Sequence, residues 1–390
     1  AEVWSTELGP AGVGGYDSEP IVADGHVYVG HSISDVDGGV SVHALDGATG
    51  APVWERQVVA GNTNIGWSLP LARSGDVLTA GYVGILGAGG CTAAHAELDP
   101  SDGSGPITTD GIQISSAVTA GAMVVRLHKT IDDPASIACA AGPATVRARN
   151  LDTGREVWAL SFGPSLSAGS AWHSTFVPTV ADGRAFVAWG TRLVAFALGG
   201  CGAPTCQPTW TATAGAEISG TTPPVATNGG QVLVVTQDGE LLSFSAANGA
   251  LRWRADLDWE PSGGILDFGP RPAIAVRGDV AYVTSSTGGE GHLRAYAANG
   301  CGTAVCAPLW SATVPATVGA PATTGGVVFV GTDGSLLAYD AAGCGAATCD
   351  PVATVPVTGT AYSLAIADGR LYTSGNGHVT ALAPTPPPTG

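Results

Sequence analysis

Several short segments of this sequence combine aromatic rings with carboxylate or amide side chains. That mixture suits the capture of a sugar, a peptide or a cation. A carboxylate pair such as Glu260 with Asp258 or Asp267 would also suit general acid–base chemistry. Equally, the rings could fill space between packed elements, and scattered acids are expected in an acidic chain. Both interpretations stay open for the residues concerned, which are Asn64, Trp67, Trp172, His173, Asp258, Trp259, Glu260 and Asp267.

Other patterns that carry chemistry are incomplete. His31 with Asp35 and Asp37 could begin a metal-binding loop, but a calcium loop needs six or more oxygen ligands, and an Asp/Gly turn explains the same residues. The sequence contains no Gly-x-Ser-x-Gly elbow, no His-Glu-x-x-His pair and no P-loop. We therefore assign no catalytic residue and no metal site.

The cysteines form a regular pattern. Three pairs share a Cys-x4-Cys spacing, and Cys91 and Cys139 complete an even set. A zinc knuckle is the alternative, but zinc sites use shorter Cys-x2-Cys spacing with further ligands nearby. The pattern favours disulfides and therefore an oxidising compartment, which means a secreted or cell-surface protein. The pairs are Cys201/Cys206, Cys301/Cys306 and Cys344/Cys349.

Charge and hydropathy narrow the range of partners. The chain has 390 residues, a net charge of −17 and only 15 Lys and Arg residues, so we exclude nucleic acid as a partner. No apolar run reaches membrane-spanning length, and we expect no membrane span. The acidic surface favours solubility and a monomer, and a protein or a carbohydrate is the partner class that remains.

Internal repetition is the dominant feature of the sequence. A glycine-bearing turn followed by an alternating apolar strand occurs eight times, which predicts eight hairpins. The interval between copies fits four short strands, the content of one propeller blade. The copies are 23–29, 74–78, 120–125, 181–187, 228–234, 277–283, 325–330 and 367–372.

A second repeated element follows the hairpins. Its clearest copies are 44–54, 150–158 and 245–253, each of which runs through a polar turn to a tryptophan. Two further copies carry a cysteine pair inside the turn and end at Trp210 and Trp310. The copy that contains Cys344 and Cys349 lacks the tryptophan, as does the copy at 98–103.

The pattern Ala-x-Asp-x-x-Thr-Gly-x-x-x-Trp resembles the tryptophan-docking motif of quinoprotein-like (PQQ-like) propellers. The resemblance covers nearly the whole chain, and it implies that the tryptophan of each outer strand packs against the neighbouring blade. On this basis we assign structural docking roles to Trp4, Trp54, Trp158, Trp210, Trp253 and Trp310.

The order of the repeats predicts how the ring closes. Trp4 lies in an outer-strand pattern with no hairpin before it, and the last repeat, 361–383, has three strands and no outer one. We therefore predict an all-β, eight-bladed β-propeller of four-stranded antiparallel blades over residues 1–383, closed when the N-terminal strand completes the C-terminal blade. Residues 384–390 read as a Pro/Thr-rich linker tail.

Strand order also places the loops. If the strands of each blade are named A (inner) to D (outer), the three Cys-x4-Cys pairs fall in C–D turns on the lower face. Cys91 and Cys139 fall in the B–C loops of blades 2 and 3 on the upper face, and we predict a bridge between them. The aromatic and acidic residues named above fall in D–A loops, which are also on the upper face.

The resemblance also allows a catalytic hypothesis to be weighed. Quinoprotein alcohol dehydrogenases use adjacent cysteines, a bound Ca²⁺ and an aspartate base, and this sequence has no adjacent cysteines. We expect neither PQQ nor calcium. We favour an extracellular, non-catalytic binding or scaffold propeller that presents its upper face to a protein or glycan. The alternatives are an enzyme, either a quinone-dependent dehydrogenase or a hydrolase or lyase that uses the upper-face acids, and a structural cell-surface or filament subunit.

Overall fold

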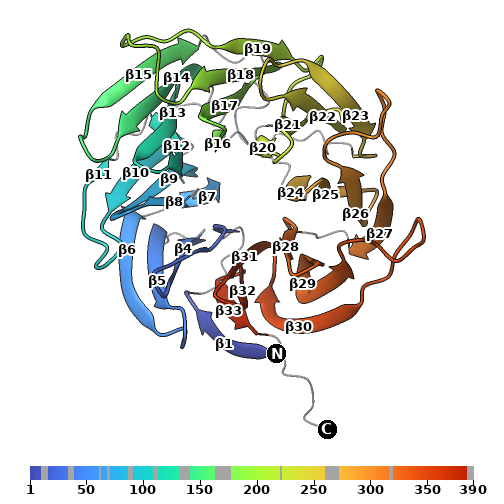
Figure 1. The fold of residues 1–390 in the computed structure, drawn as a ribbon. Coiled ribbons are helices and arrows are strands. Elements are labelled where there is room, and N and C mark those ends of the chain that lie inside the picture. The colour runs from blue at the N-terminus through green and yellow to red at the C-terminus, as the bar shows by residue number, and fades with distance from the viewer. Residues whose placement is uncertain are drawn as a thin grey trace.

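The computed structural model shows eight β-sheets arranged as blades around one axis (Figure 1). The residues it describes contain strands and no helix. They are 1–9, 16–33, 39–60, 63–67, 71–86, 91–108, 113–131, 141–162, 177–219, 222–259, 272–315 and 319–383. The predicted eight-bladed propeller is confirmed.

The first four blades follow the chain in order. Blade 1 consists of β2 (Tyr16–Asp17), β3 (Ile21–Ala23), β4 (His26–Ile33), β5 (Gly39–Asp46) and β6 (Pro52–Ala60). Blade 2 consists of β7 (Thr63–Trp67), β8 (Leu71–Ser74), β9 (Val77–Leu86), β10 (Cys91–Leu98) and β11 (Ile107–Thr108). Blade 3 consists of β12 (Gln113–Ala120), β13 (Met123–Ile131), β14 (Ala141–Asn150) and β15 (Glu156–Phe162). Blade 4 consists of β16 (Thr179–Ala181), β17 (Arg184–Trp189), β18 (Arg192–Ala197) and β19 (Trp210–Thr213).

The other four blades complete the circle. Blade 5 consists of β20 (Val225–Ala226), β21 (Gln231–Val235), β22 (Glu240–Ser245) and β23 (Leu251–Asp256). Blade 6 consists of β24 (Ala273–Arg277), β25 (Val280–Thr287), β26 (Glu290–Ala297) and β27 (Trp310–Pro315). Blade 7 consists of β28 (Ala322–Thr324), β29 (Val327–Asp340) and β30 (Ala353–Thr360). Blade 8 consists of β31 (Ser363–Ala367), β32 (Arg370–Gly375), β33 (His378–Leu382) and β1 (Glu2–Glu7).

Two details depart from eight identical four-stranded units. The inner strand is split in blade 1 into β2 and β3, and in blade 2 into β7 and β8. In blade 7, the continuous strand β29 supplies both the B and the C positions, because it pairs with β28 at one end and with β30 at the other.

Local sequence explains the hairpins. The turn before β4 has Asp24 and Gly25 at positive φ, 50° and 74°, and the turns at Asp182 and Asp368 repeat this geometry. Asp and Gly tolerate that region, and it matches the twist of the flanking strands. The B strands that follow are buried on both faces, which is why they read as continuous apolar runs.

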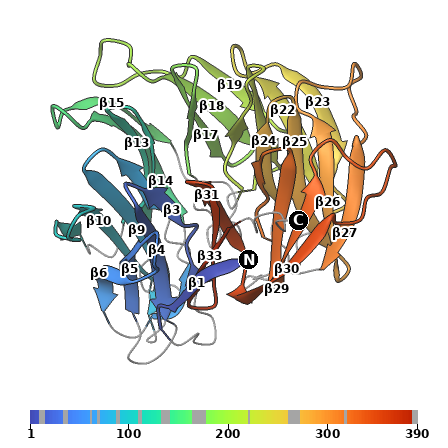
Figure 2. The same ribbon diagram turned by 60° about the horizontal axis from the view of Figure 1, so that its bottom comes forward.

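The N-terminal strand closes the ring. β1 pairs antiparallel with β33, and Trp4 lies opposite Ala381. On the axis, the inner strands contact one another in the order β3, β8, β12, β16, β20, β24, β28, β31 and back to β3. Figure 2 shows β1 beside β33, strands from opposite ends of the chain. The predicted closure is therefore present.

The hydrophobic core lies between neighbouring blades, at surfaces that we call seams. At the seam of blades 8 and 1, the indole of Trp4 donates a hydrogen bond of 3.2 Å to the carbonyl oxygen of Gly47. A Cβ on Gly50 would lie 2.5 Å from the ring of Trp4, so the turn approaches the indole through glycine. The outer strand of one blade therefore docks on the C–D turn of the next.

The same contact recurs at five further seams. In each, a tryptophan of an outer strand donates its indole N–H to a carbonyl oxygen in the following C–D turn. The pairs are Trp54 with Pro100 at 2.8 Å, Trp158 with Leu198 at 3.1 Å, Trp210 with Ala246 at 3.0 Å, Trp253 with Ala298 at 3.2 Å and Trp310 with Ala341 at 3.4 Å.

The three Cys-x4-Cys pairs are disulfides in C–D turns, joining Cys201 to Cys206, Cys301 to Cys306 and Cys344 to Cys349. Each loop lies along the outer strand of the preceding blade. In β23, for example, the main-chain N–H of Arg254 donates to the carbonyl oxygen of Ala304 at 2.9 Å. The carbonyl oxygen of Arg254 accepts a hydrogen bond of 2.8 Å from the amide of Cys306. Parallel bridges also join Ala159 to Thr205 and Ser311 to Thr348. The disulfide loops therefore connect blades as well as closing turns.

Two glycines of blade 5 test the docking contact directly. Gly249 (φ 72°) lies under Trp210, where a Cβ would be 2.6 Å from the ring, whereas Gly230 (φ 70°) has open space around it. Ala at either site costs about 1–2 kcal/mol because of the left-handed backbone. Gly249→Ala must also displace Trp210, so we expect it to lower the free energy of unfolding by about 1 kcal/mol more than Gly230→Ala does. Urea unfolding of both variants measures the difference, and equal losses would contradict the docking role of Gly249.

Candidate functional site

The upper face, which carries the D–A and B–C connections, is where the sequence places its candidate ligand residues. Trp172, His173, Glu260 and Asp267 lie outside the described residues. Cys139 does too, and of Cys91 only the backbone is described, so the predicted Cys91–Cys139 bridge stays a prediction. Asn64, Trp67, Asp258 and Trp259 are within the described parts of the chain.

Asn64 and Trp67 lie in a strand and not in a loop. They belong to β7, which pairs with β9, and Trp67 lies opposite Val83. The segment Thr63–Trp67 forms the first part of the inner strand of blade 2, and its pairing with β9 fixes the backbone. Their expected place in the D–A loop is therefore corrected, while their proposed contact with a ligand stays a prediction.

Trp259 has a packing role in the structure. Its side chain is 4% exposed and lies in the seam of blades 5 and 6 with Val235, Leu241 and Val283. A Cβ on Gly239 would lie 2.3 Å from the carbonyl oxygen of Trp259, so the B–C turn of blade 5 packs directly on this residue. The ring is therefore not available to a ligand on the upper face in this structure.

Asp258, the neighbouring residue, is an exposed anchor. It adopts φ 45°, and its carboxylate is 70% exposed and accepts a hydrogen bond of 2.9 Å from Arg294. Arg294 also donates to the carbonyl oxygen of Leu257 at 2.5 Å. This ion pair holds the start of the connection between blades 5 and 6 on β26. Of the predicted site residues, the structure brings together Asp258 and Trp259 alone in its described part.

A histidine–aspartate pair, which the sequence analysis did not identify, lies at the upper end of the seam between blades 8 and 1. His31 Nδ1 donates a hydrogen bond of 2.6 Å to Asp17, and the other oxygen of Asp17 accepts from the Gly377 amide at 2.8 Å. The two side chains are only 2% and 1% exposed, so a substrate cannot reach them. The pair joins the first hairpin of blade 1 to the B–C turn of blade 8. Asp17 and His31 are fourteen residues apart with no motif between them, and only ring closure places Gly377 beside Asp17.

His43 lies next to this pair and extends it into the blade. Its ring centroid is 6.0 Å from that of His31, and its side chain is buried. Burial lowers the pKa of His43, and the neighbouring His31 acts in the same direction. Burial, the largest effect, therefore disfavours the charged form of His43, although Glu55 opposes it. Among the described residues, no three His, Cys, Asp or Glu side chains are grouped as metal ligands would be.

Comparison with known families shows the family to which this chain belongs. A family model described as outer membrane protein assembly factor BamB matches residues 1–105 and 143–303. The chain belongs to the PQQ-like β-propeller family. A search of curated protein sequences finds no match.

Solved structures show how widely this PQQ-like fold is shared. BamB from Moraxella catarrhalis has a TM-score of 0.63 at 15% identity, covering 98% of each chain. Quinohemoprotein alcohol dehydrogenase from Comamonas testosteroni has a TM-score of 0.63 at 16% identity, covering 98% of this chain and 76% of its own. The computationally designed Ika8 protein has a TM-score of 0.60 at 13% identity, with 97% and 99% covered. At these identities the likeness concerns the fold.

Two further findings concern helices and disulfides. In the described part of the chain, no helix has the length and apolarity needed to cross a membrane. The three disulfides are typical of proteins that fold in an oxidising compartment.

The seam of blades 2 and 3 lacks a docked tryptophan and holds an ionic cluster in its place. Glu97 of β10 contacts Arg126 of β13 at 2.5 Å and Arg149 of β14 at 3.3 Å. His95, whose Nε2 is 3.7 Å from Glu97, lowers the pKa of Glu97 together with the two guanidinium groups, from 4.5 to about 2. The cluster is a second candidate for chemistry, but its contacts run between blades 2 and 3, which favours a role in blade packing.

Glu97→Gln tests that assignment through pH. Because the folded-state pKa of Glu97 is depressed, its contribution is complete above pH 4.5 and is lost as pH falls towards 2. We expect the substitution to cost about 2 kcal/mol at neutral pH, and the difference from the parent protein to shrink through that window. Urea unfolding at a series of pH values measures both.

Glu156→Gln is the matched control. Glu156 accepts a 2.9 Å hydrogen bond from Arg147, but both side chains are about half exposed, 45% and 51%. Its loss should cost less than about 0.5 kcal/mol. If Glu97→Gln cost no more than this control, or if its cost did not depend on pH, the cluster would not stabilise the seam.

Proposed function

We propose that this protein is a non-catalytic binding scaffold that acts outside the cytoplasm and presents its upper face to a protein partner. The observation that carries the proposal is the difference between the two faces. On the lower face, six C–D turns are used as docking sites for tryptophans of neighbouring blades. Those turns therefore make the contacts that join neighbouring blades.

The upper face has the opposite character. Its longest connections join β15 to β16 across residues 163–178 and β23 to β24 across residues 257–272. Connections between the elements of a rigid scaffold are the usual carriers of binding residues. Of the described ionisable pairs on this face, Asp17 and His31 are buried, and the exposed Asp258 is paired with Arg294. These contacts support recognition in preference to catalysis.

The family supports a protein as the partner. The matching family model is described as an outer membrane protein assembly factor. The net charge of −17 favours a partner surface that carries Lys and Arg. Disulfides in the lower-face turns are compatible with an envelope or extracellular setting. Carbohydrate is the alternative ligand class for the same face.

Site-specific photocrosslinking separates the two faces. A benzophenone side chain would replace Asp238 or Glu290 in the upper B–C turns of blades 5 and 6, and Ala247 or Ala304 in the lower turns of the same blades. All four positions are exposed. In the source organism, we expect discrete protein adducts from the two upper positions and none from their lower counterparts. Adducts from the lower positions alone, or none from the upper ones, would contradict the proposal.

The proposal also excludes PQQ-dependent catalysis. Quinoprotein alcohol dehydrogenases are among the structural neighbours, and a quinone enzyme is the natural alternative. The cysteines do not fit that chemistry, because none are adjacent in sequence and the three described pairs close turns on the lower face.

Thermal unfolding provides the discriminating measurement. A cofactor that binds only the native protein must raise its melting temperature, by an amount equivalent to about 2.7 kcal/mol at a hundredfold excess over Kd. We expect no shift with PQQ and Ca²⁺ together and no dye-linked oxidation of alcohols. A saturable rise in melting temperature would favour the enzyme.

A further inference from the structure

The seam between blades 7 and 8 differs from the six tryptophan-docked seams. Trp210 and Trp310 each follow the second cysteine of their disulfide loop by four residues, and at the same distance after Cys349 stands Ala353. Ala353 pairs with Ala338 in the register in which Trp310 pairs with Ala295. An alanine therefore occupies the position of a docking tryptophan.

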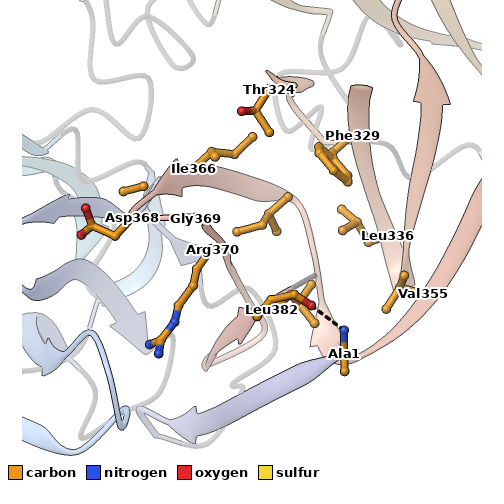
Figure 3. Close-up of a pocket in the computed structure, with 13 residues that line it drawn as sticks. Ala1, Thr324, Phe329, Leu336, Val355, Ile366, Asp368, Gly369, Arg370 and Leu382 are labelled. Atoms are coloured by element: carbon orange, nitrogen blue, oxygen red, sulfur yellow. Dashed lines mark hydrogen bonds between the residues drawn. The ribbon is translucent and has the colours of Figure 1, made fainter. Parts of the chain in front are cut away.

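A pocket of about 600 Å³ lies in this seam, and Val355 of β30 is one of the residues that line it (Figure 3). Its walls come from both blades and are mainly apolar, although Asp368 and Arg370 also line it. Phe329, Leu336 and Val355 line it from blade 7, and Ile366, Leu371 and Leu382 line it from blade 8. Val355 lies two residues after Ala353 on β30, so both side chains face the same side of the strand.

The walls correspond to the residues that flank an indole elsewhere in the ring. Trp310 lies between Tyr282 and Tyr339, with ring centroids 6.1 and 6.2 Å away. Phe329 is the third residue of β29, as Tyr282 is of β25. Leu382 follows Ala381 in blade 8 as Tyr339 follows Ala338 in blade 7. The pocket is thus the tryptophan-docking space of this seam, bounded by equivalent side chains.

In the described residues, the edge of β30 lacks the disulfide-loop contact that the outer strands β15, β23 and β27 have. The disulfide loops of blades 4, 6 and 7 form parallel bridges to the outer strands β15, β23 and β27. Blade 8 has no C–D turn that could do the same for β30, because its outer strand is the N-terminal β1. Val352, just before Ala353, is 66% exposed, and Leu309, just before Trp310, is 56% exposed, so this position faces solvent at both seams. An extended segment could therefore lie along this edge and present a side chain to the pocket.

We propose that this seam pocket binds an aromatic side chain, an indole above all, carried by an extended segment of a partner protein. The side chains that flank the ring of Trp310 have counterparts in Phe329 and Leu382 of this pocket, which favours an aromatic ring as the occupant. Residues 384–390 contain no aromatic residue, so they cannot supply the ring. The site lies on the face opposite to the proposed upper-face function, and either can fail without the other.

N-acetyl-5-fluorotryptophanamide is a suitable probe, because the ten tryptophans of the protein would obscure a fluorescence signal. We expect its ¹⁹F resonance to broaden saturably with the parent protein. N-acetylleucinamide should compete at least about tenfold more weakly than unlabelled N-acetyltryptophanamide.

Ala353→Trp should fill the pocket from within the chain. We expect it to raise the melting temperature and to weaken binding of the probe by at least about tenfold. Thr354→Trp is the matched control: it adds the same ring one residue along, on the opposite side of β30, and should leave binding unchanged.

Val355→Trp provides a second filling variant if Ala353→Trp does not fold, because Val355 lines the pocket directly. Absence of broadening with the parent protein would overturn the proposal. Equal binding by the parent protein and by a folded filling variant would overturn it as well, since the probe would then bind elsewhere.

Discussion

The indole that lies on the turn of the next blade is the contact on which this ring depends. Each blade is a small twisted sheet with apolar side chains on both faces, and it can bury them only against two neighbours. The indole fixes the distance and rotation between neighbouring blades. Its ring fills the outer part of the seam, and its N–H donates a hydrogen bond to a carbonyl oxygen of the turn. Glycine is required where the turn meets the ring, as at Gly50 and Gly103. The docking geometry therefore constrains two blades at once.

Seams that lack this contact are resolved in different ways. Between blades 2 and 3, Glu97 reaches across the seam to Arg126 and Arg149, at 2.5 and 3.3 Å. Between blades 7 and 8, the fully buried core is aliphatic and the outer part remains a pocket. The same topology thus tolerates an aromatic, an ionic or an open seam. The open one coincides with the blade assembled from both ends of the chain, where no C–D turn exists for a tryptophan to meet.

Much of the fold was predictable because it depends on short sequence patterns that recur in every blade. Asp-Gly turns, alternating strands and the spacing to each tryptophan gave the blade count, the closing strand and the docking roles of Trp4 through Trp310. The site was less predictable, because its contacts join residues that are remote in sequence. Asp17 meets Gly377 only after the ring closes, and Trp259 turned out to be packing against blade 5. The missing tryptophan at 353 was visible in the sequence, but the shape of the space beside it required the neighbouring blade.

The disulfide loops are distributed unevenly around the ring. Each loop is closed by a disulfide within its own blade, and its backbone forms a bridge to the outer strand of the preceding blade. Disulfide-closed loops therefore connect the blades at three seams, those of blades 3 and 4, 5 and 6, and 6 and 7. Blades 1 and 2 carry no Cys-x4-Cys loop. A force that widens the ring would therefore act first on the seams without such a loop, among them the seam of blades 4 and 5, where Trp210 docks on Ala246.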